Sequence, residues 1–218
     1  MSEKKINGAE ALIMSLERCG IEMTFGIPGG AAIPLYDAIY DTRKNMKFVL
    51  VRHEQNAAHE ADGYARATGK PAAVLVTSGP GAVNTVTGIM TAHMDSVPMI
   101  VITGQSSREM LGKDAFQEAD VFNLTMPVVK HSYLLKNVND IPRIIKEAYH
   151  IATTGRPGPV LIDVPKDVGT DIFTGDWDAP INLPAYKPEK CGYEPETLQK
   201  IADALAASRR PVILSGHG

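Results

Sequence analysis

The chain has 218 residues, of which 44% are hydrophobic and 22% charged, enough for one globular domain and part of a second. Its formal net charge of −3 comes without a dense run of Lys and Arg, which argues against nucleic acid as a partner. No apolar run approaches the roughly 18 residues that span a bilayer, and the polar start MSEKKING does not resemble a signal peptide. Cys19 and Cys191 lack disulfide or metal-ligand spacing. We therefore expect a cytoplasmic protein with no membrane partner.

Strands and helices are predicted to alternate through residues 1–165, which we expect to form one domain. In chain order, apolar spacing predicts a helix over residues 8–19, a strand Met23–Phe25, a helix through Ile33 and Ile39, and a buried strand Lys47–Val51. Glu54 is expected in the first turn of the next helix, whose apolar stripe is Ala57, Ala58, Ala61, Tyr64 and Ala65. A strand Ala72–Val76, a helix over residues 82–92, a strand Met99–Thr103, a helix over residues 141–152 and a strand Pro159–Val164 are expected to follow. This alternation predicts an α/β fold with a doubly wound, mostly parallel sheet flanked by helices.

The last part of the chain has a different composition. Residues 166–195 contain many Pro and Gly residues with little periodicity, which predicts a linker. A helix over Glu196–Ala207 and a strand Val212–Leu214, which leads into Ser-Gly-His-Gly, are expected to follow. Because one helix and one strand cannot bury a core, residues 196–218 are expected to begin a second, truncated domain.

One carboxylate, Glu54, is predicted to lie where a strand passes into a helix. Ligands bind at this edge of open α/β sheets, because the loops there surround a crevice. Glycine-rich loops at Gly26–Gly30 and Thr77–Asn84, and Gln105 with Gln117 beyond it, open on the same edge. Position alone is equally consistent with a simpler role, in which the negative charge of Glu54 only complements the helix dipole.

Several common chemistries are excluded by spacing. The glycine loops lack the Lys-Ser/Thr of a P-loop, and His59 follows His53-Glu54 at the wrong distance for a helical zinc site. The G-x-S-x-G pattern of serine hydrolases is absent. A single carboxylate among glycine loops, without metal ligands, suits proton transfer on a bound organic group.

Five motifs carry a more specific resemblance: FGIPGGA, VRHEQNAAHEADGYAR, TSGPGAVN, DAFQEAD and GRPGPVLIDVPKD, in this order. Together they resemble the N-terminal pyrimidine-binding domain of thiamine-diphosphate enzymes, and within these the biosynthetic acetolactate (acetohydroxyacid) synthase large subunits. The resemblance covers residues 5–218. It implies a homodimeric or larger enzyme that joins two 2-ketoacids, pyruvate with pyruvate or 2-ketobutyrate, with loss of CO2 in branched-chain amino-acid biosynthesis. A regulatory small subunit is a further partner that the resemblance implies.

The resemblance also assigns roles to residues. Glu54 matches the glutamate that hydrogen-bonds N1′ of the cofactor's aminopyrimidine and thereby promotes loss of the thiazolium C2 proton. Residues around the pyrimidine ring are matched by Thr77, Pro80 and Asn84. Gly30 and Gln117 match residues that line the reaction centre of the family, and Phe116 and Lys166 match residues of its substrate channel. The resemblance therefore implies four catalytic residues: Glu54, Gln117, Gly30 and Lys166. Positions near a structural flavin are matched by Asp95 and Arg156.

The chain departs from the family pattern in one important respect. The GDG…N motif that binds Mg²⁺ and the diphosphate is absent, so the metal ligands are expected outside this chain, as is most of an FAD-binding domain. The fragment alone is expected to be inactive. Two alternatives remain open: another thiamine-diphosphate-dependent 2-ketoacid or acyl-CoA decarboxylase or carboligase, and a non-catalytic α/β ligand-binding module.

Overall fold

The computed structural model describes residues 5–188 and 192–216. The chain divides into two compact units, Met1–Pro184 and Ala185–Gly218. Cys191 and the final two residues of the predicted Ser-Gly-His-Gly turn lie outside the described residues.

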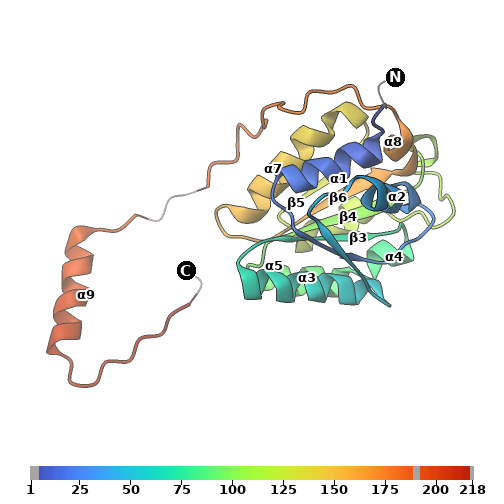
Figure 1. Cartoon of the computed structure of the whole chain (residues 1–218). Helices are drawn as coiled ribbons and strands as arrows, with labels where there is room; N and C mark the ends of the chain where they lie inside the picture. The colour runs from blue at the N-terminus through green and yellow to red at the C-terminus, as the bar shows by residue number, and fades with distance from the viewer. Residues whose placement is uncertain (1–4, 189–191, 217–218) are drawn as a thin grey trace. The chain divides into compact units, whose positions relative to one another are not determined.

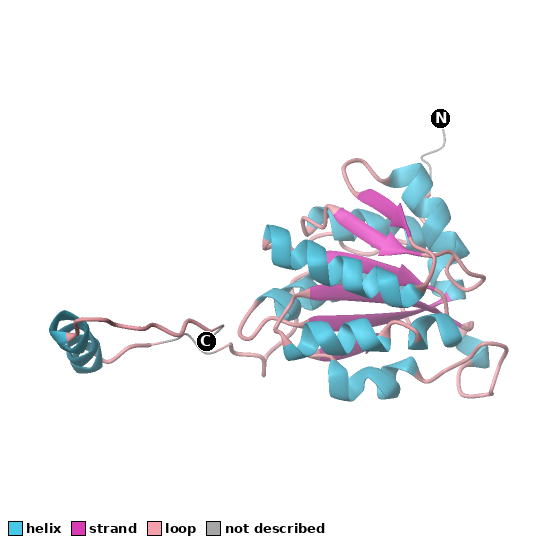
Figure 2. Cartoon of the chain, turned by 90° about the horizontal axis from the view of Figure 1, so that it is seen from below, coloured by secondary structure: helices cyan, strands magenta, loops and turns pink. Residues whose placement is uncertain are grey.

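The first unit is built on a six-stranded sheet in which every neighbouring pair of strands is parallel (Figure 2). Its strands lie in the order β2-β1-β3-β4-β6-β5. They are β1 (Met23–Gly26), β2 (Lys47–Leu50), β3 (Ala72–Val76), β4 (Met99–Gln105), β5 (His131–Leu134) and β6 (Pro159–Pro165). The order runs outward from β1 to one side and then to the other, which confirms the predicted doubly wound sheet.

Helices cover both faces of this sheet (Figure 1). One face carries α1 (Gly8–Arg18), α2 (Ile33–Thr42), α7 (Ile141–Thr153) and α8 (Lys166–Thr170). The other carries α3 (Glu54–Thr68) and α5 (Val86–Met94). Shorter helices are α4 (Pro80–Val83), α6 (Val121–Thr125) and the 3-10 turns η1 (Arg108–Met110), η2 (Met126–Val128) and η3 (Val138–Asp140).

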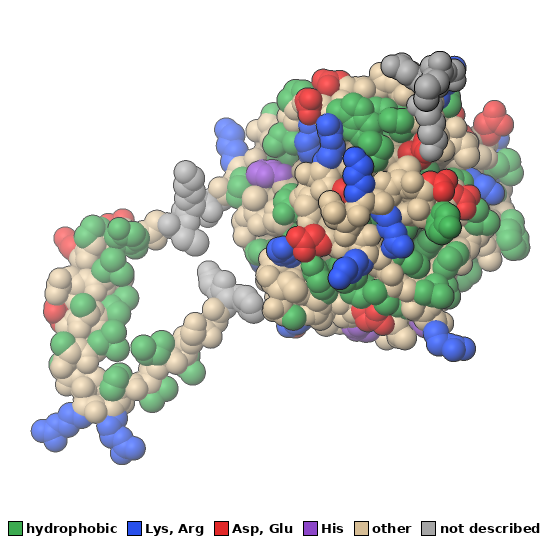
Figure 3. All heavy atoms as spheres, in the orientation of Figure 1, with side chains coloured by type: hydrophobic (Ala, Val, Ile, Leu, Met, Phe, Trp, Pro, Cys, Tyr) green, Lys and Arg blue, Asp and Glu red, His purple; other side chains and the backbone are tan. Residues whose placement is uncertain are grey.

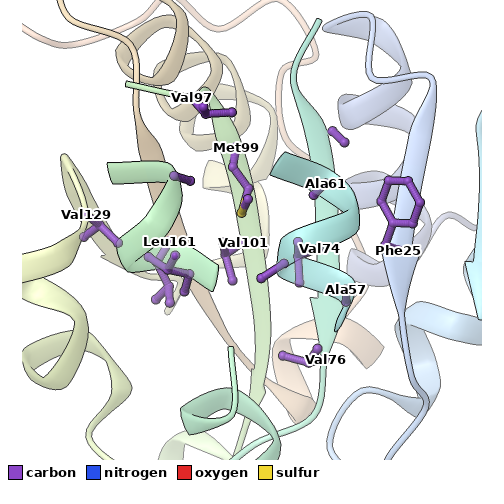
Figure 4. Close-up of a cluster of buried hydrophobic side chains, with 14 of the residues drawn as sticks. Phe25, Ala57, Ala61, Val74, Val76, Val97, Met99, Val101, Val129 and Leu161 are labelled. Carbon is purple, nitrogen blue, oxygen red and sulfur yellow. The ribbon is translucent and has the colours of Figure 1, made fainter. Parts of the chain in front are cut away.

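Small residues bring α3 close to the sheet and to α5. Ala57, Ala58 and Ala61 of α3 are fully buried, and they face strand residues such as Val74 and Val101 (Figure 4). A Cβ added to Gly88 of α5 would lie 2.4 Å from the Cβ of Ala58, so only glycine permits this helix contact. The close packing fixes the start of α3, and with it Glu54, relative to the strands.

Two sequence predictions in this unit are corrected by the structure. The strand at β2 was predicted to be buried, but it is the edge of the sheet, and 64% of Leu50 is exposed. An edge strand pairs with a neighbour on one side and leaves its other side open to solvent. The apolar composition of β2 had suggested a strand buried inside the sheet. The helix predicted over residues 82–92 is two helices, α4 and α5, separated at Asn84 and Thr85. The hydroxyl of Thr85 donates to the carbonyl of Ala82 at 2.6 Å and so competes with helical hydrogen bonding.

The segment predicted as a linker begins with α8, and its residues up to Pro184 belong to the first unit. Phe173 N–H donates to the carbonyl of Ile6 at 2.9 Å, and Asn182 N–H donates to the buried carboxylate of Glu147 at 2.8 Å. These bonds hold residues 172–182 against the domain, which local composition does not reveal.

The second unit contains α9 (Pro195–Ala207), as predicted. The predicted strand Val212–Leu214 is wrong: these residues form no strand, and 95% of Leu214 is exposed. A strand needs a neighbour to pair its backbone groups, and the described part of this unit provides none.

Lys and Arg side chains lie across the middle of the face of the first unit that Figure 3 shows, with Asp and Glu side chains between and around them. Among the described residues, no helix has the length and apolar character that a membrane span requires.

Candidate functional site

Glu54 is the first residue of α3, directly after the turn that follows β2. His53 caps this helix: its Nδ1 accepts a hydrogen bond from Gln55 N–H at 3.2 Å. The Glu54 carboxylate is half-buried at the positive end of a 15-residue helix, which favours a negative charge there.

Asn84 binds one oxygen of this carboxylate. Its Nδ2 donates to Glu54 Oε2 at 3.0 Å, and Asn84 is the only hydrogen-bond partner of the Glu54 carboxylate among the described residues. Asn84 can reach Glu54 because it lies in the break between α4 and α5. The second oxygen, Oε1, remains available to accept a hydrogen bond from a ligand.

Glycines keep the surroundings of Oε1 open. A Cβ on Gly81 would lie 3.2 Å from Glu54 Oε1 and 2.7 Å from Thr77 Cγ2. A Cβ on Gly29 would lie 2.5 Å from the Cβ of Thr77, and Ala31 N–H approaches Thr77 Oγ1 at 3.3 Å. Three loops, those after β1, β2 and β3, therefore meet around Thr77 and Glu54, and larger residues at these glycines would close the space.

Tyr36 lies near Glu54, and sequence analysis did not single it out. Its hydroxyl donates to the carbonyl of Leu75 at 2.6 Å, and its ring packs edge-on against Phe48 at 5.4 Å between centroids. Burial and the nearby negative charge of Glu54 raise the pKa of Tyr36 well above its ordinary value. In the sequence Tyr36 is one member of the apolar stripe of α2, and no motif distinguishes it from a packing residue.

The segment Leu111–Asp120 brings two further predicted residues to the same edge. A Cβ on Gly79 would lie 2.4 Å from the carbonyl oxygen of Gln117, so the loop after β3 and this segment are in direct backbone contact. Gln117 has a φ of 55°, a left-handed conformation that non-glycine residues seldom adopt and that is often found at functional sites. Its neighbour Phe116 is 89% exposed.

The remaining predicted residues of this edge are Gly30, Pro80 and Lys166. Pro80 opens α4, and a Cβ on Gly30 would meet nothing within 4 Å. Lys166 is exposed at the start of α8, directly after β6. Arg108 holds this region together, because it pairs with Asp167 at 2.7 Å and Asp171 at 2.6 Å.

Asp95 and Arg156 lie elsewhere. They precede β4 and β6, so they are at the amino ends of the strands, about 20 Å from the carboxyl ends for a seven-residue strand. Arg66 pairs with Asp95 at 2.6 Å, whereas Arg156 donates to Ser96 Oγ at 2.8 Å and to the carbonyl of Met94 at 3.0 Å. The structure therefore does not bring these two residues together with Glu54, and a ligand there would occupy a separate site.

The arrangement at the carboxyl edge suits proton transfer on a bound organic group. A carboxylate with one oxygen fixed and the other open can hold a proton toward a ligand atom. Among the residues that the structure describes, no group of three His, Cys, Asp or Glu side chains is placed to hold a metal ion.

Comparison with known proteins gives a family for this site. Residues 6–124 match the model of the thiamine pyrophosphate enzyme N-terminal TPP-binding domain. The chain is 48% identical over 215 residues to an acetolactate synthase of Mycobacterium bovis, covering 99% of this chain and 34% of that protein. It is 49% identical over 216 residues to an acetolactate synthase large subunit of Lactococcus lactis, covering 99% of this chain and 37% of that protein.

A more distant organism gives the same result. A probable acetolactate synthase large subunit of Methanocaldococcus jannaschii is 50% identical over 216 residues, covering 98% of this chain and 36% of that protein. The chain thus spans about a third of the length of these relatives. The chain belongs to the thiamine pyrophosphate enzymes and contains their N-terminal TPP-binding domain.

Proposed function

We propose that this chain is the N-terminal part of an acetolactate synthase large subunit, which joins two 2-ketoacids with loss of CO2. Pyruvate is the proposed donor, and pyruvate or 2-ketobutyrate the acceptor. The observation that carries the proposal is the Glu54 carboxylate, fixed by Asn84 and open at Oε1, within a chain about half identical to acetolactate synthases over nearly all its length.

Glu54 is proposed to bind the pyrimidine of thiamine diphosphate. The cofactor, when bound, supplies the carbon nucleophile that attacks a 2-ketoacid and accepts the electrons left by CO2. Glu54 would hold a proton between Oε1 and a ring nitrogen, while Asn84 keeps the carboxylate from rotating. Thr77 and Pro80 would line the ring, with Gly29 and Gly81 leaving room for it.

The segment Leu111–Asp120 and α8 are proposed to form the substrate side of the site. Gln117 and Gly30 would face the reacting atoms. Phe116 and Lys166, both exposed, would line the channel through which the 2-ketoacids enter. A cationic Lys166 suits the carboxylate of a 2-ketoacid.

Two more cofactors are part of the proposal. Mg²⁺ would hold the diphosphate through ligands outside this chain, since the described residues contain no suitable cluster of His, Cys, Asp and Glu. FAD would lie near Asp95 and Arg156, at the opposite edge of the sheet. Its separation from Glu54 fits a structural role for the flavin better than a direct role in the reaction.

Association with a second copy is also proposed, and a regulatory small subunit is a further proposed partner. The outer surface of α5 exposes Met90 and Met94, of which 42% and 61% are accessible. Exposed apolar residues on one helix are typical of a homo-oligomeric interface.

The test uses a longer polypeptide, in which this chain is extended to the full length of its acetolactate synthase relatives. It is supplied with thiamine diphosphate, Mg²⁺ and pyruvate, and the product is identified. Acetolactate is expected. Acetaldehyde as the main product would indicate a decarboxylase of the same superfamily, and no consumption of pyruvate would contradict the proposal.

A further inference from the structure

The acidic side chain of Asp163, in the middle of the apolar strand β6, is 2% exposed. Its Oδ1 accepts from the hydroxyl of Thr103 at 2.6 Å, and its Oδ2 accepts from Nε2 of Gln105 at 2.9 Å. Lys, Arg and His side chains form no ion pair with it in the described part of the chain. A buried carboxylate without a cation is costly, and the site already described makes no use of it.

Gln105 connects Asp163 to the segment that carries Phe116 and Gln117. The same Nε2 donates to the carbonyl of Ala119 at 2.9 Å, and Oε1 accepts from Ser106 N–H at 2.8 Å. All three partners require the same orientation of the Gln105 amide, with Nε2 toward Asp163 and Ala119. Asp163, the only charged group of the three, therefore helps to hold the amide in this orientation.

The bond to Ala119 is the hydrogen bond that attaches the segment Leu111–Asp120 to the sheet. Within the described residues, it is the only hydrogen bond that joins this segment to a residue outside 107–124. The other bonds are internal; for example, Glu118 accepts from Ala115 N–H at 2.8 Å and from Gly112 N–H. A cavity of about 290 Å³, lined by Gln105, Phe122 and Asp163 among others, separates part of the segment from the strand ends. Packing on the core is therefore confined to part of the segment, and it includes Ala119, the residue that also accepts the bond from Gln105.

We propose that Asp163, acting through the amide of Gln105, is the positioning residue that holds the segment Leu111–Asp120, with Phe116 and Gln117, at the carboxyl edge of the sheet. The attachment itself rests on the hydrogen bonds above. Its importance for the reaction rests on the proposed function.

Titration of Asp163 gives a readout for this role. Burial raises its pKa to about 7, hydrogen bonds from Thr103 and Gln105 oppose the rise, and the negative charge of Asp120 adds to it. Glu118 is the other acidic residue that lines the cavity. Above this pKa the bond from Gln105 is charge-assisted, and such bonds are roughly twice as strong as neutral ones.

The first experiment uses the 218-residue chain, labelled for NMR, and needs no variant. We expect the carboxyl carbon of Asp163 and the amides of residues 119–122 to titrate with one midpoint near 7. In Asp163→Asn these amides should lose that transition, because a neutral amide oxygen can still accept from Gln105 but cannot titrate. Amides of 119–122 that do not follow Asp163 in the unmodified chain would overturn the proposal.

The second experiment removes the attachment. Gln105→Met cannot bond Ala119, and hydrogen exchange at Gly112, Ala115 and Glu118 should rise about tenfold, as expected for one lost hydrogen bond. Exchange in β3 should stay unchanged. Thr103→Val is the matched control, since it removes the other donor to Asp163 and should leave exchange in the segment unchanged at pH 8. Equal hydrogen exchange in Gln105→Met and the unmodified chain would contradict the proposal. If Gln105→Met does not fold, the NMR titration of Asp163 and the amides of residues 119–122 decides.

The catalytic consequence can be separated from the attachment. In the longer polypeptide, we expect kcat/KM for pyruvate to fall below a pH near 7, and this limb to be absent in Asp163→Asn. An enzyme inactive on pyruvate at every pH refutes the proposed function but leaves the NMR result standing. An active enzyme whose pH profile is unaffected by Asp163→Asn refutes the positioning role.

Discussion

Asn84 donates a 3.0 Å hydrogen bond to Glu54, although the two residues are 30 positions apart in the sequence. The bond occupies Oε2 and leaves Oε1 as the free acceptor. Glu54→Gln replaces one oxygen by a donor and removes the charge. In the longer polypeptide we expect the exchange of deuterium at C2 of thiamine diphosphate to slow by about 10²-fold or more.

Glu60→Gln is the matched control for this change, because Glu60 is exposed on the same helix. It should leave the exchange rate unaltered. Equal rates in Glu54→Gln and Glu60→Gln would remove Glu54 from the proposed role.

Gly81 supplies the second prediction. Gly81→Ala would place a Cβ 3.2 Å from Glu54 Oε1 and 2.7 Å from Thr77 Cγ2, so the two side chains must move apart. We expect affinity of the longer polypeptide for thiamine diphosphate to fall about tenfold or more, as for roughly 1.4 kcal/mol. Isothermal calorimetry measures it.

Gly63→Ala is the control for Gly81→Ala. A Cβ on Gly63 meets nothing within 4 Å, and the residue lies inside α3. Because alanine favours helix, the free energy of unfolding of this variant, measured with urea, should rise by about 0.5–1 kcal/mol. Its affinity for thiamine diphosphate should be unchanged. Similar affinities for the two variants would mean that the space beside Glu54 is not the cofactor site.

The sequence predicts the sheet better than the site. Both faces of β4 are covered, so the apolar run Met99–Thr103 was enough to predict this strand. Strand β5 was not predicted, because His131 and Tyr133 interrupt its apolar pattern. The proximity of Glu54 and Asn84 depends on the break between α4 and α5, which helical periodicity obscured. Tyr36 and Asp163 could not be singled out from the sequence, because each makes its hydrogen bonds with a strand that is distant in sequence.

Association can be tested on the exposed methionines of α5. Met90→Lys adds a charge to the proposed interface and should shift the longer polypeptide toward the monomer in sedimentation velocity. Tyr40→Lys is the control, since Tyr40 on α2 is 86% exposed and lies outside this interface. A dimer that persists in Met90→Lys, or is lost in Tyr40→Lys, would locate the interface elsewhere.

Glu17 makes stability depend on pH. Its Oε1 accepts from the N–H groups of Lys44, Asn45 and Met46 at 2.8 Å each. Partial burial raises the pKa of Glu17, but these three bonds outweigh it, and the folded-state pKa lies below the ordinary value of 4.5. The stabilisation is therefore complete above about pH 4.5 and is lost as the pH falls through the folded-state pKa.

Glu17→Gln should lower the free energy of unfolding by about 1–2 kcal/mol at pH 7, measured by urea denaturation of the 218-residue chain. The difference from the unmodified chain should shrink as the pH falls below about 4.5, because protonation then removes the same charge. A difference that stays constant from pH 7 to pH 3 would show that the bonds, and not the charge, carry the effect.

The last prediction is that the 218-residue chain folds but binds thiamine diphosphate weakly and does not turn over pyruvate. Its sheet and both helical layers are complete, so the domain has its own core. The described residues supply a carboxylate for the pyrimidine but no cluster of acidic or histidine ligands for Mg²⁺, and the diphosphate charge would remain unneutralised. Calorimetry with thiamine diphosphate, with and without Mg²⁺, should give the same weak affinity in both cases. Tight binding that requires Mg²⁺, or measurable loss of pyruvate, would show that the chain contains a diphosphate site of its own.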